Sequence, residues 1–340
     1  MSLLYTHTHT QTKVKRLVDE NKLPHLLLYG PPGTGKTSMI LAIAKQMYGT
    51  RAGQMTLHLN ASDARGIDVV RNDIQGFAST RHIFNKGFKL IILDECDAMT
   101  NDAQFALRRI IEKYTKNVRF CLICNYVNKV IPALQSRCTR FRFSPLEDTY
   151  MRQRLQHIIQ QEGLKVEEQE EQEEKGSSKG LEAVVRLSRG DMRRALNLLQ
   201  SISMSSSTSP SEGEGEGEGQ VVLNEAAVYS CTGQTHPNQV KEMVRLLLND
   251  PFKECMSKIG EMQRTEGFAL VDILSDVYLW VVRLSLPNQV TADLLDSLAE
   301  VEYNLAGSSS EKLQLGGMVG AFMKARKDIV DTATATAMVT

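Results

Sequence analysis

The sequence predicts a parallel α/β sheet followed by two helical domains. Over the first 146 residues, short apolar strands alternate with helical segments, which is typical of a parallel sheet with right-handed crossovers. The strand pattern stops near residue 147, and amphipathic helices follow to about residue 331. The 340 residues are also too many for one ordinary hydrophobic core, so we expect several domains.

Composition is that of an ordinary globular protein, with 42% apolar and 24% charged residues and a formal net charge of zero. The charge balance excludes a chain that binds nucleic acid along its whole surface, although a local basic patch stays possible. No apolar run approaches the length of a membrane span, and no basic-then-apolar leader opens the chain. We therefore expect an intracellular protein without a membrane partner.

The six cysteines are scattered, and only Cys121 and Cys124 form a C-x-x-C pair. That pair lies within an apolar strand and has no second pair to complete a zinc site. Buried free thiols are the better interpretation.

The α/β region contains a phosphate-binding loop, because residues 30–37 fit the pattern G-x-x-x-x-G-K-[ST]. An apolar strand at 25–29 precedes the loop, and a helix at 38–46 follows it. Glycines let the backbone N–H groups turn toward phosphate oxygens, and the helix N-terminus adds positive charge. Lys36 can reach the β- and γ-phosphates, and the Thr37 hydroxyl can hold Mg²⁺. The candidate ATP-binding residues are Gly30, Pro31, Pro32, Gly33, Thr34, Gly35, Lys36 and Thr37.

The other strands of the sheet are predicted at 55–59, 88–93, 118–124 and 139–143. The intervening helices are predicted at 67–79 and 102–113, and a first helix at 14–20.

Polar residues at the ends of two strands supply further chemistry. Asp94 can hold Mg²⁺, and Glu95 beside it can polarise a water against the γ-phosphate. A strand with such a pair normally adjoins the phosphate-loop strand, although here residues 54–82 intervene in sequence. Asn125 follows the next strand and can orient the attacking water. Together these residues favour an ATP-hydrolysing machine over a kinase.

Two arginines are candidate contacts to the transferring phosphoryl group. Arg137 lies in Ser136-Arg137-Cys138, on a loop after the fourth strand, and Arg193 opens a helix of the second domain. An arginine supplied by a neighbour can stabilise phosphoryl charge, but a surface arginine more often simply faces water.

The domains expected from these patterns are given by residue number. A disordered tail (1–12) precedes a nucleotide-binding α/β domain (13–146) and a small helical domain (147–235). The small domain carries an acidic and a Glu-Gly low-complexity insertion at 165–180 and 205–219, which cannot bury a core. An all-helical domain (236–331) and a frayed end (332–340) follow. Helices are expected at 147–164, 181–204, 238–249, 251–263, 268–284, 289–306 and 311–329.

Five motifs follow one another along the chain: residues 30–37, Asn60-Ala61-Ser62-Asp63, Asp94-Glu95-Cys96-Asp97, Ser136-Arg137-Cys138 and residues 190–197. In this order and spacing they resemble those of the AAA+ clamp-loader ATPases, and most closely the small subunits of eukaryotic replication factor C. The likeness covers about residues 15–330.

The resemblance implies an AAA+ domain, a helical lid and a helical collar through which five related subunits assemble. It implies a nuclear ATPase that uses ATP and Mg²⁺ to load the sliding clamp PCNA onto primer–template DNA in replication and repair. It also implies roles for individual residues. Asn125 would be the first sensor and Arg193 the second, Glu95 the base, and Arg137 the finger that reaches a neighbour's ATP. Arg65, Arg71, Arg81 and Lys86 would contact DNA, and the segment from Met99 to Phe105 would face the clamp.

The chain departs from the family pattern at its beginning. Family members open with a stretch ending Glu-Lys-Tyr-Arg-Pro that helps to cradle adenine, and this chain lacks it, so we expect an incomplete adenine pocket. Cys96 also replaces the usual alanine.

Two alternatives to an active clamp-loader ATPase follow from the sequence. A mainly structural subunit would hydrolyse little ATP and lend Arg137 to its neighbour. A different AAA+ remodeller, such as an origin-recognition or branch-migration protein, would usually end in a winged-helix domain. The helical pattern of 237–331 argues against this second alternative.

Overall fold

The computed structural model describes residues 8–20, 22–61, 70–80, 87–166, 178–206, 222–307 and 310–339. The chain divides into two compact units, residues 1–222 and 223–340, which are treated separately below.

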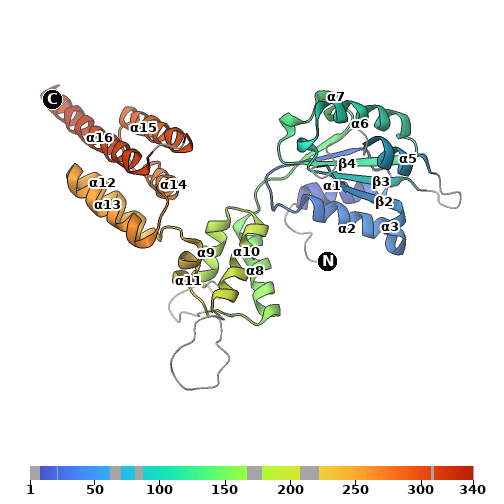
Figure 1. Ribbon diagram of the computed structural model, residues 1–340, viewed down its shortest axis with the longest axis horizontal. Helices are drawn as coiled ribbons and strands as arrows, with labels where there is room; N and C mark the ends of the chain where they lie inside the picture. Colours follow the sequence, from blue (N-terminus) through green and yellow to red (C-terminus); the bar gives the residue numbers. More distant parts are fainter. Residues whose placement is uncertain are drawn as a thin grey trace, which may run out of the picture. The chain divides into compact units, whose positions relative to one another are not determined.

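The first unit is built on a five-stranded parallel sheet (Figure 1). Its strands lie in the order β2-β3-β4-β1-β5, so β4 separates β3 from β1. The expectation that the Asp94 strand adjoins the phosphate-loop strand is therefore wrong, because β4 pairs with both. The strands are β1 (Leu26–Tyr29), β2 (Thr56–Asn60), β3 (Lys89–Asp94), β4 (Val118–Cys124) and β5 (Thr139–Arg142).

Helices cover both faces of this sheet because its central strands are apolar on both sides. Alternate residues of β1 and β4, such as Leu26 and Leu27, belong to different core clusters on opposite faces. One face packs against α1 (Thr8–Asp19) and α2 (Lys36–Tyr48), and the other against α5 (Gln75–Ser79) and α6 (Asn101–Tyr114). Shorter segments are η2 (Gly49–Arg51), α3 (Ala52–Met55), η3 (Val70–Ile74), η4 (Cys96–Ala98), η5 (Val127–Lys129) and α7 (Pro132–Gln135).

Three helices complete the first unit, and they pack on one another. They are α8 (Asp148–Glu162), α9 (Lys179–Ser188) and α10 (Met192–Ser206). The stretch 181–204, predicted to be helical, is interrupted between α9 and α10. Arg189 and Gly190 have φ angles of 49° and 82°, and this left-handed turn ends α9.

The second unit is helical, with buried apolar side chains from its last five helices in one core. Its helices are α11 (Glu225–Thr232), α12 (Pro237–Asn249), α13 (Phe252–Glu266), α14 (Leu270–Val281), α15 (Asn288–Ala306) and α16 (Glu311–Val339). Helices α12 to α15 match the predicted helices closely and α16 begins where predicted, whereas α11 was not predicted. Two short strands, β6 (Lys165–Val166) and β7 (Val222–Leu223), form a separate two-stranded sheet.

Both ends of the described chain are more helical than predicted. Helix α1 begins at Thr8, within the expected tail 1–12, and α16 continues through 332–339, which were expected to fray. Of the two proposed insertions, residues 167–177 and 207–219 lie outside the described residues, and the remaining positions belong to β6 and to the ends of α9 and α10.

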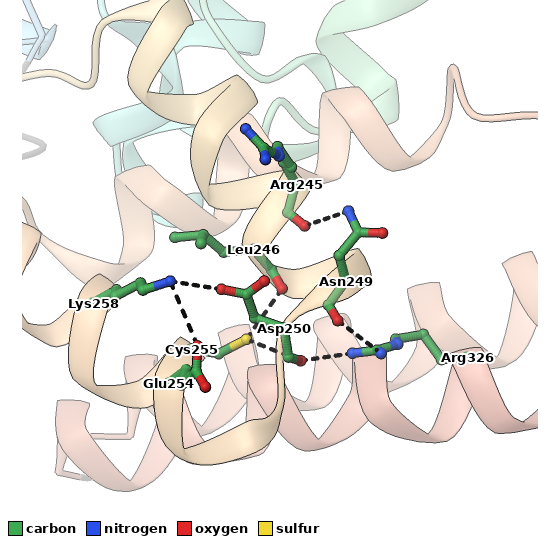
Figure 2. A network of polar contacts seen from close by, with 8 residues as sticks. All are labelled: Arg245, Leu246, Asn249, Asp250, Glu254, Cys255, Lys258 and Arg326. Atoms are coloured by element: carbon green, nitrogen blue, oxygen red, sulfur yellow. Dashed lines mark hydrogen bonds and ion pairs between the residues drawn. The ribbon is translucent and has the colours of Figure 1, made fainter.

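The turn between α12 and α13 is closed by a residue from the far end of the second unit (Figure 2). Arg326 on α16 donates from Nη1 to the Asp250 carbonyl (2.7 Å) and from Nη2 to the Asn249 carbonyl (3.0 Å). These carbonyls end α12 and have no partner within that helix. On the other side of the turn, Lys258 Nζ lies 2.7 Å from Asp250 Oδ2.

All six cysteines are free thiols, and burial raises the pKa of Cys121 and Cys124. This confirms the interpretation of the C-x-x-C pair, and the described residues contain no group of three or more His, Cys, Asp or Glu able to hold a metal. Within the described part of the chain, no helix is long and apolar enough to cross a membrane.

His25, which immediately precedes β1, is a buried titratable group in the first unit. Its Nδ1 accepts the N–H of Phe120 (3.1 Å), while Nε2 is buried without a hydrogen-bond partner. Burial, and then the positive charge of Arg119, lower the pKa of His25 to about 4. The folded protein therefore favours neutral His25.

We predict that this histidine makes the protein less stable in mild acid. Because its pKa is lower in the folded than in the unfolded chain, its contribution is fully present above pH 6.5. The contribution is lost as the pH falls from 6.5 to about 4. The loss is about 3 kcal/mol of unfolding free energy. Urea unfolding at several pH values should show a shallower pH dependence for His25→Gln. His157→Gln, on the exposed side of α8, is the control, and an unchanged slope in His25→Gln would contradict the prediction.

Candidate functional site

The phosphate loop connects β1 to α2 in a backbone conformation that only glycine adopts easily. Gly30, Gly33 and Gly35 have φ angles of 145°, 66° and 87°. A Cβ on Gly30 would lie 2.1 Å from the Phe143 carbonyl oxygen. The phosphate loop therefore packs tightly against Phe143, the residue that follows β5.

Lys36, the first residue of α2, is buried with only 7% of its surface exposed. Its Nζ donates to the carbonyls of Gly30 and Pro31, each at 2.8 Å, and to Asn125 Oδ1 at 3.1 Å. Burial is the main cause that lowers the pKa of Lys36, while Asp94 acts in the opposite direction. The ammonium is thus held between the phosphate loop and the end of β4.

Thr37 and Asp94 bring two oxygen atoms together beside Lys36. Thr37 Oγ1 donates to Asp94 Oδ2 at 2.7 Å, and Asp94 Oδ1 accepts the Glu95 N–H at 2.9 Å. Hydroxyl and carboxylate oxygens are the ligands that Mg²⁺ prefers. The residues present therefore fit Mg²⁺.

Glu95 follows β3 in a left-handed conformation, with φ 54° and an exposed side chain. A non-glycine residue in this conformation is uncommon and is found most often where function demands it. The turn directs the chain from β3 into η4 and leaves the carboxylate at the carboxyl edge of the sheet.

Asp97 is a part of the site to which sequence reasoning assigned no role. Its Oδ2 accepts the N–H groups of Asn125 (3.2 Å) and Tyr126 (3.1 Å). It therefore fixes the start of the loop whose first side chain, Asn125, contacts Lys36. The feature of the sequence that could have indicated a role for Asp97 is its position in a polar cluster, three residues after Asp94.

Helix α10 begins directly against the phosphate loop. The Met192 N–H donates to the Gly33 carbonyl at 3.3 Å, and Asp191 Oδ1 accepts the Arg194 N–H at 3.1 Å. A Cβ on Gly33 would lie 1.6 Å from Asp191 Oδ1. Arg193, one residue into α10, is near enough to contribute to the lowered pKa of Lys36. The structure thus brings Arg193 toward the phosphate loop.

Arg137 is held by residues of α6 and α7. It forms an ion pair with Glu112 Oε1 (2.5 Å from Nη2) and donates from Nη1 to the Ala133 carbonyl (2.6 Å). The same Glu112 oxygen pairs with Arg108 Nε at 3.1 Å. The structure does not place Arg137 with Lys36, Asp94 and Asn125.

Two buried or half-buried glutamines connect α6 with the segment that leads to Arg137. Gln104 donates to the Lys129 carbonyl and accepts the Ile131 N–H. Gln135 donates to the carbonyls of Val127 and Val130. These contacts fix the chain between Asn125 and Arg137 against α6. Sequence reasoning missed both, because a glutamine in a helix carries no motif.

The candidate DNA contacts Arg65, Arg81 and Lys86 lie outside the described residues. The backbone of Arg71 is in η3, but its side chain is not described.

The proposed clamp-facing segment needs one correction. Met99 is only 7% exposed and belongs to the core, so it does not present an apolar surface. Thr100 caps α6 and turns the chain so that Met99 points inward. Phe105 is 49% exposed and is available to a partner.

A phosphate loop, a strand-end Asp-Glu pair and a polar residue ending the strand between them define a P-loop nucleoside triphosphatase of the AAA class. Residues 26–146 match the family described as "ATPase family associated with various cellular activities (AAA)". Residues 235–321 match the "Replication factor C C-terminal domain".

Comparison with known proteins identifies the family more closely. The chain is 49% identical to "Replication factor C subunit 3" of Oryza sativa over 96% of its length and 85% of that protein's. It is 51% identical to "Replication factor C subunit 5" of Arabidopsis thaliana, covering 94% and 83% of the two chains. It is 48% identical to "Replication factor C subunit 5" of Homo sapiens, covering 96% and 89%. The chain belongs to the replication factor C subunit family, in the group called subunit 5 or subunit 3.

The predicted fold is confirmed as well, with a parallel AAA sheet and a helical replication factor C domain. The solved structure of a RuvB variant from Thermotoga maritima aligns at 13% identity and a TM-score of 0.49, covering 80% and 84% of the two chains. That likeness is too low to carry an argument about function.

We predict that Gly33→Ala is destabilising. An alanine would be strained at φ 66°, and its Cβ would displace the Asp191 carboxylate that caps α10. We expect a loss of about 1 to 3 kcal/mol in the free energy of unfolding, measured in urea. Gly53→Ala, where a Cβ meets nothing within 4 Å and φ is not positive, is the matched control. Equal stability of Gly33→Ala and the unmodified protein would refute the close contact between the phosphate loop and the start of α10.

Proposed function

We propose that this chain is an ATP-hydrolysing subunit of the replication factor C clamp loader. In this role it assembles with other replication factor C subunits into a heteropentamer in the nucleus. It acts with them to load the sliding clamp PCNA onto primer–template DNA during replication and repair. The observation that carries the proposal is the convergence of Lys36, Asp94 and Asn125 at the carboxyl ends of neighbouring strands. Close relatives named replication factor C subunits support it.

Each of these residues has a defined task in the proposed reaction. Lys36 and the loop N–H groups bind the phosphates of ATP, and Thr37 and Asp94 hold Mg²⁺. When bound, Mg²⁺ neutralises phosphate charge. Glu95 accepts the proton of the attacking water, and Asn125 orients that water. Arg193 contacts the phosphates from the lid.

The placement of Arg137 favours action on a neighbouring subunit. Its guanidinium is fixed on α6 and α7 and does not join the residues around Lys36. Arginine supplied in trans stabilises the charge of the transferring phosphoryl group. The chain thus binds one ATP and contributes to the hydrolysis of another.

Other surfaces of the chain would meet DNA and the clamp. Arg65, Arg71, Arg81 and Lys86 are the proposed phosphate contacts on DNA. Phe105 is the proposed apolar contact to the clamp, without Met99. The all-helical second unit is the proposed collar. The boundaries 13–146, 147–235 and 236–331 remain a proposal for the three domains.

The presence of the whole hydrolytic set within one chain favours an active ATPase over a mainly structural subunit. We predict that Glu95→Gln, which keeps the shape but not the basicity of the side chain, lowers the DNA- and clamp-stimulated ATPase of the reconstituted complex. A loss of about tenfold or more is expected at the site that this chain forms, since general bases contribute about 10²–10⁴-fold. Arg137→Ala should lower the activity of the neighbouring site instead.

These two variants separate the alternatives. If Glu95→Gln keeps full ATPase and clamp loading while Arg137→Ala abolishes them, the chain is a structural subunit. Glu147→Gln, on the exposed surface at the start of α8, controls for loss of a carboxylate elsewhere.

We further predict that DNA binding belongs to the whole complex and weakens steeply with salt, because the contacts go to phosphates. Replacing any one of Arg65, Arg71, Arg81 or Lys86 by alanine should reduce the slope of log affinity against log salt by about one. Fluorescence anisotropy with a labelled primer–template measures this slope. Lys116→Ala, at the exposed amino-terminal edge of β4, should leave it unchanged. Tight, salt-insensitive binding by the isolated chain would refute the proposal.

A further inference from the structure

We propose that Glu112 on α6 is a positioning residue for Arg137. In this view, the Glu112 carboxylate holds the Arg137 guanidinium in the orientation in which it meets the nucleotide of the neighbouring subunit. The inference rests on the proposed action of Arg137 in trans. It adds a residue outside the phosphate loop, the strand ends and the lid.

The contact geometry restricts the guanidinium from two sides. Glu112 Oε1 lies 2.5 Å from Arg137 Nη2, and the Ala133 carbonyl accepts from Nη1 at 2.6 Å. Ser136 Oγ lies 3.4 Å from Nη1 and adds a weaker contact. The two strong acceptors come from different helices, so they fix both the position and the rotation of the planar group.

These contacts leave donors free for a phosphate. A guanidinium carries five N–H groups, and Glu112 and Ala133 together occupy two of them in the shortest contacts. The Arg137 side chain remains 31% exposed. Arginine binds phosphate through paired N–H donors in a fixed plane, so a guanidinium whose plane is already set loses less freedom when phosphate arrives.

Helix α6, which carries Glu112, is hydrogen-bonded to the segment before α7 that leads to Arg137. Gln104, two turns before Glu112 on α6, is bonded to Lys129 and Ile131 just ahead of α7. Glu112 and Arg137 therefore sit on parts of the chain that are already held together. The ion pair sets the last side-chain rotations rather than the helix positions.

Arg108 also pairs with the Glu112 carboxylate, so Glu112 and Arg137 are not an isolated surface ion pair. Its Nε lies 3.1 Å from the same Oε1 atom, one turn before Glu112 on α6. Arg108 and then Arg137 lower the pKa of the Glu112 carboxyl, so it stays ionised. Exposed ion pairs contribute little to stability, and we therefore expect the effect of Glu112 in catalysis rather than in folding.

The test uses the reconstituted complex with PCNA and primer–template DNA. Steady-state ATP hydrolysis is measured for Glu112→Ala, Glu112→Gln, Arg137→Ala and the double variant Glu112→Ala/Arg137→Ala. Glu20→Ala is the matched control, because Glu20 pairs with Arg16 four residues earlier on an exposed helix end, as Glu112 does with Arg108. Assembly of every variant is checked by size-exclusion chromatography.

We expect Glu112→Ala to reduce the Arg137-dependent part of kcat by roughly tenfold, with the KM for ATP unchanged, because misplacing a catalytic group lowers the rate of the chemical step. Glu112→Gln keeps an acceptor oxygen and should retain more of this activity. In the Arg137→Ala background, removing Glu112 should cause no further loss, because the two residues act as a unit. Glu20→Ala should match the unmodified complex.

One result would overturn the inference and leave the trans role of Arg137 intact. In that result, Glu112→Ala keeps full or increased ATPase activity, whereas Arg137→Ala loses it. Additive losses in the double variant would also overturn the inference. Full activity of Arg137→Ala would overturn the trans role and the inference together. If Glu112→Ala fails to assemble, Glu112→Ser, whose side chain is too short to reach Arg137, and its double variant with Arg137→Ala decide by the same criteria.

Discussion

The buried ammonium of Lys36 is the constraint on which the first unit depends. A buried charge is tolerated only where polar groups surround it, and here they come from two places. The carbonyls of Gly30 and Pro31 turn inward from the loop, and Asn125 reaches across from the end of β4. The glycine conformations, the strand order and the anchoring of Asn125 by Asp97 all serve to surround this one charge.

Local patterns in the sequence predicted most of the fold. The strands around Leu28, Ile91 and Leu122 are continuous apolar runs, because both faces of the sheet are covered. The strand order was not predictable in the same way. Nothing in β4 indicates that it lies between β1 and β3, since lateral order depends on long-range packing. Arg193 was expected to open a helix, but the bounds 181–204 did not place the break at Arg189, because a non-glycine residue adopts a left-handed conformation there.

In the candidate site, too, local motifs were predictable from sequence and contacts between distant segments were not. Residues with a motif, such as Lys36 and Asp94, were found from sequence and are brought together by the fold. Residues that hold those side chains in place, such as Asp97 and Glu112, were not, because their role is a contact between distant segments. Met99 was misassigned because an apolar residue before a helix cap can face either way. Only the packing of α6 decides which.

The closure of the α12–α13 turn by Arg326 has a consequence for the order of folding. The two partners are 76 residues apart in the chain, and they meet only when α16 lies against the end of α12. During synthesis, the Asn249 and Asp250 carbonyls therefore lack this hydrogen-bond donor until nearly the whole second unit has left the ribosome. Formation of this corner is a late event. A ribosome paused before residue 326 would hold α12 to α15 without the side chain that ties the end of α12 to α16.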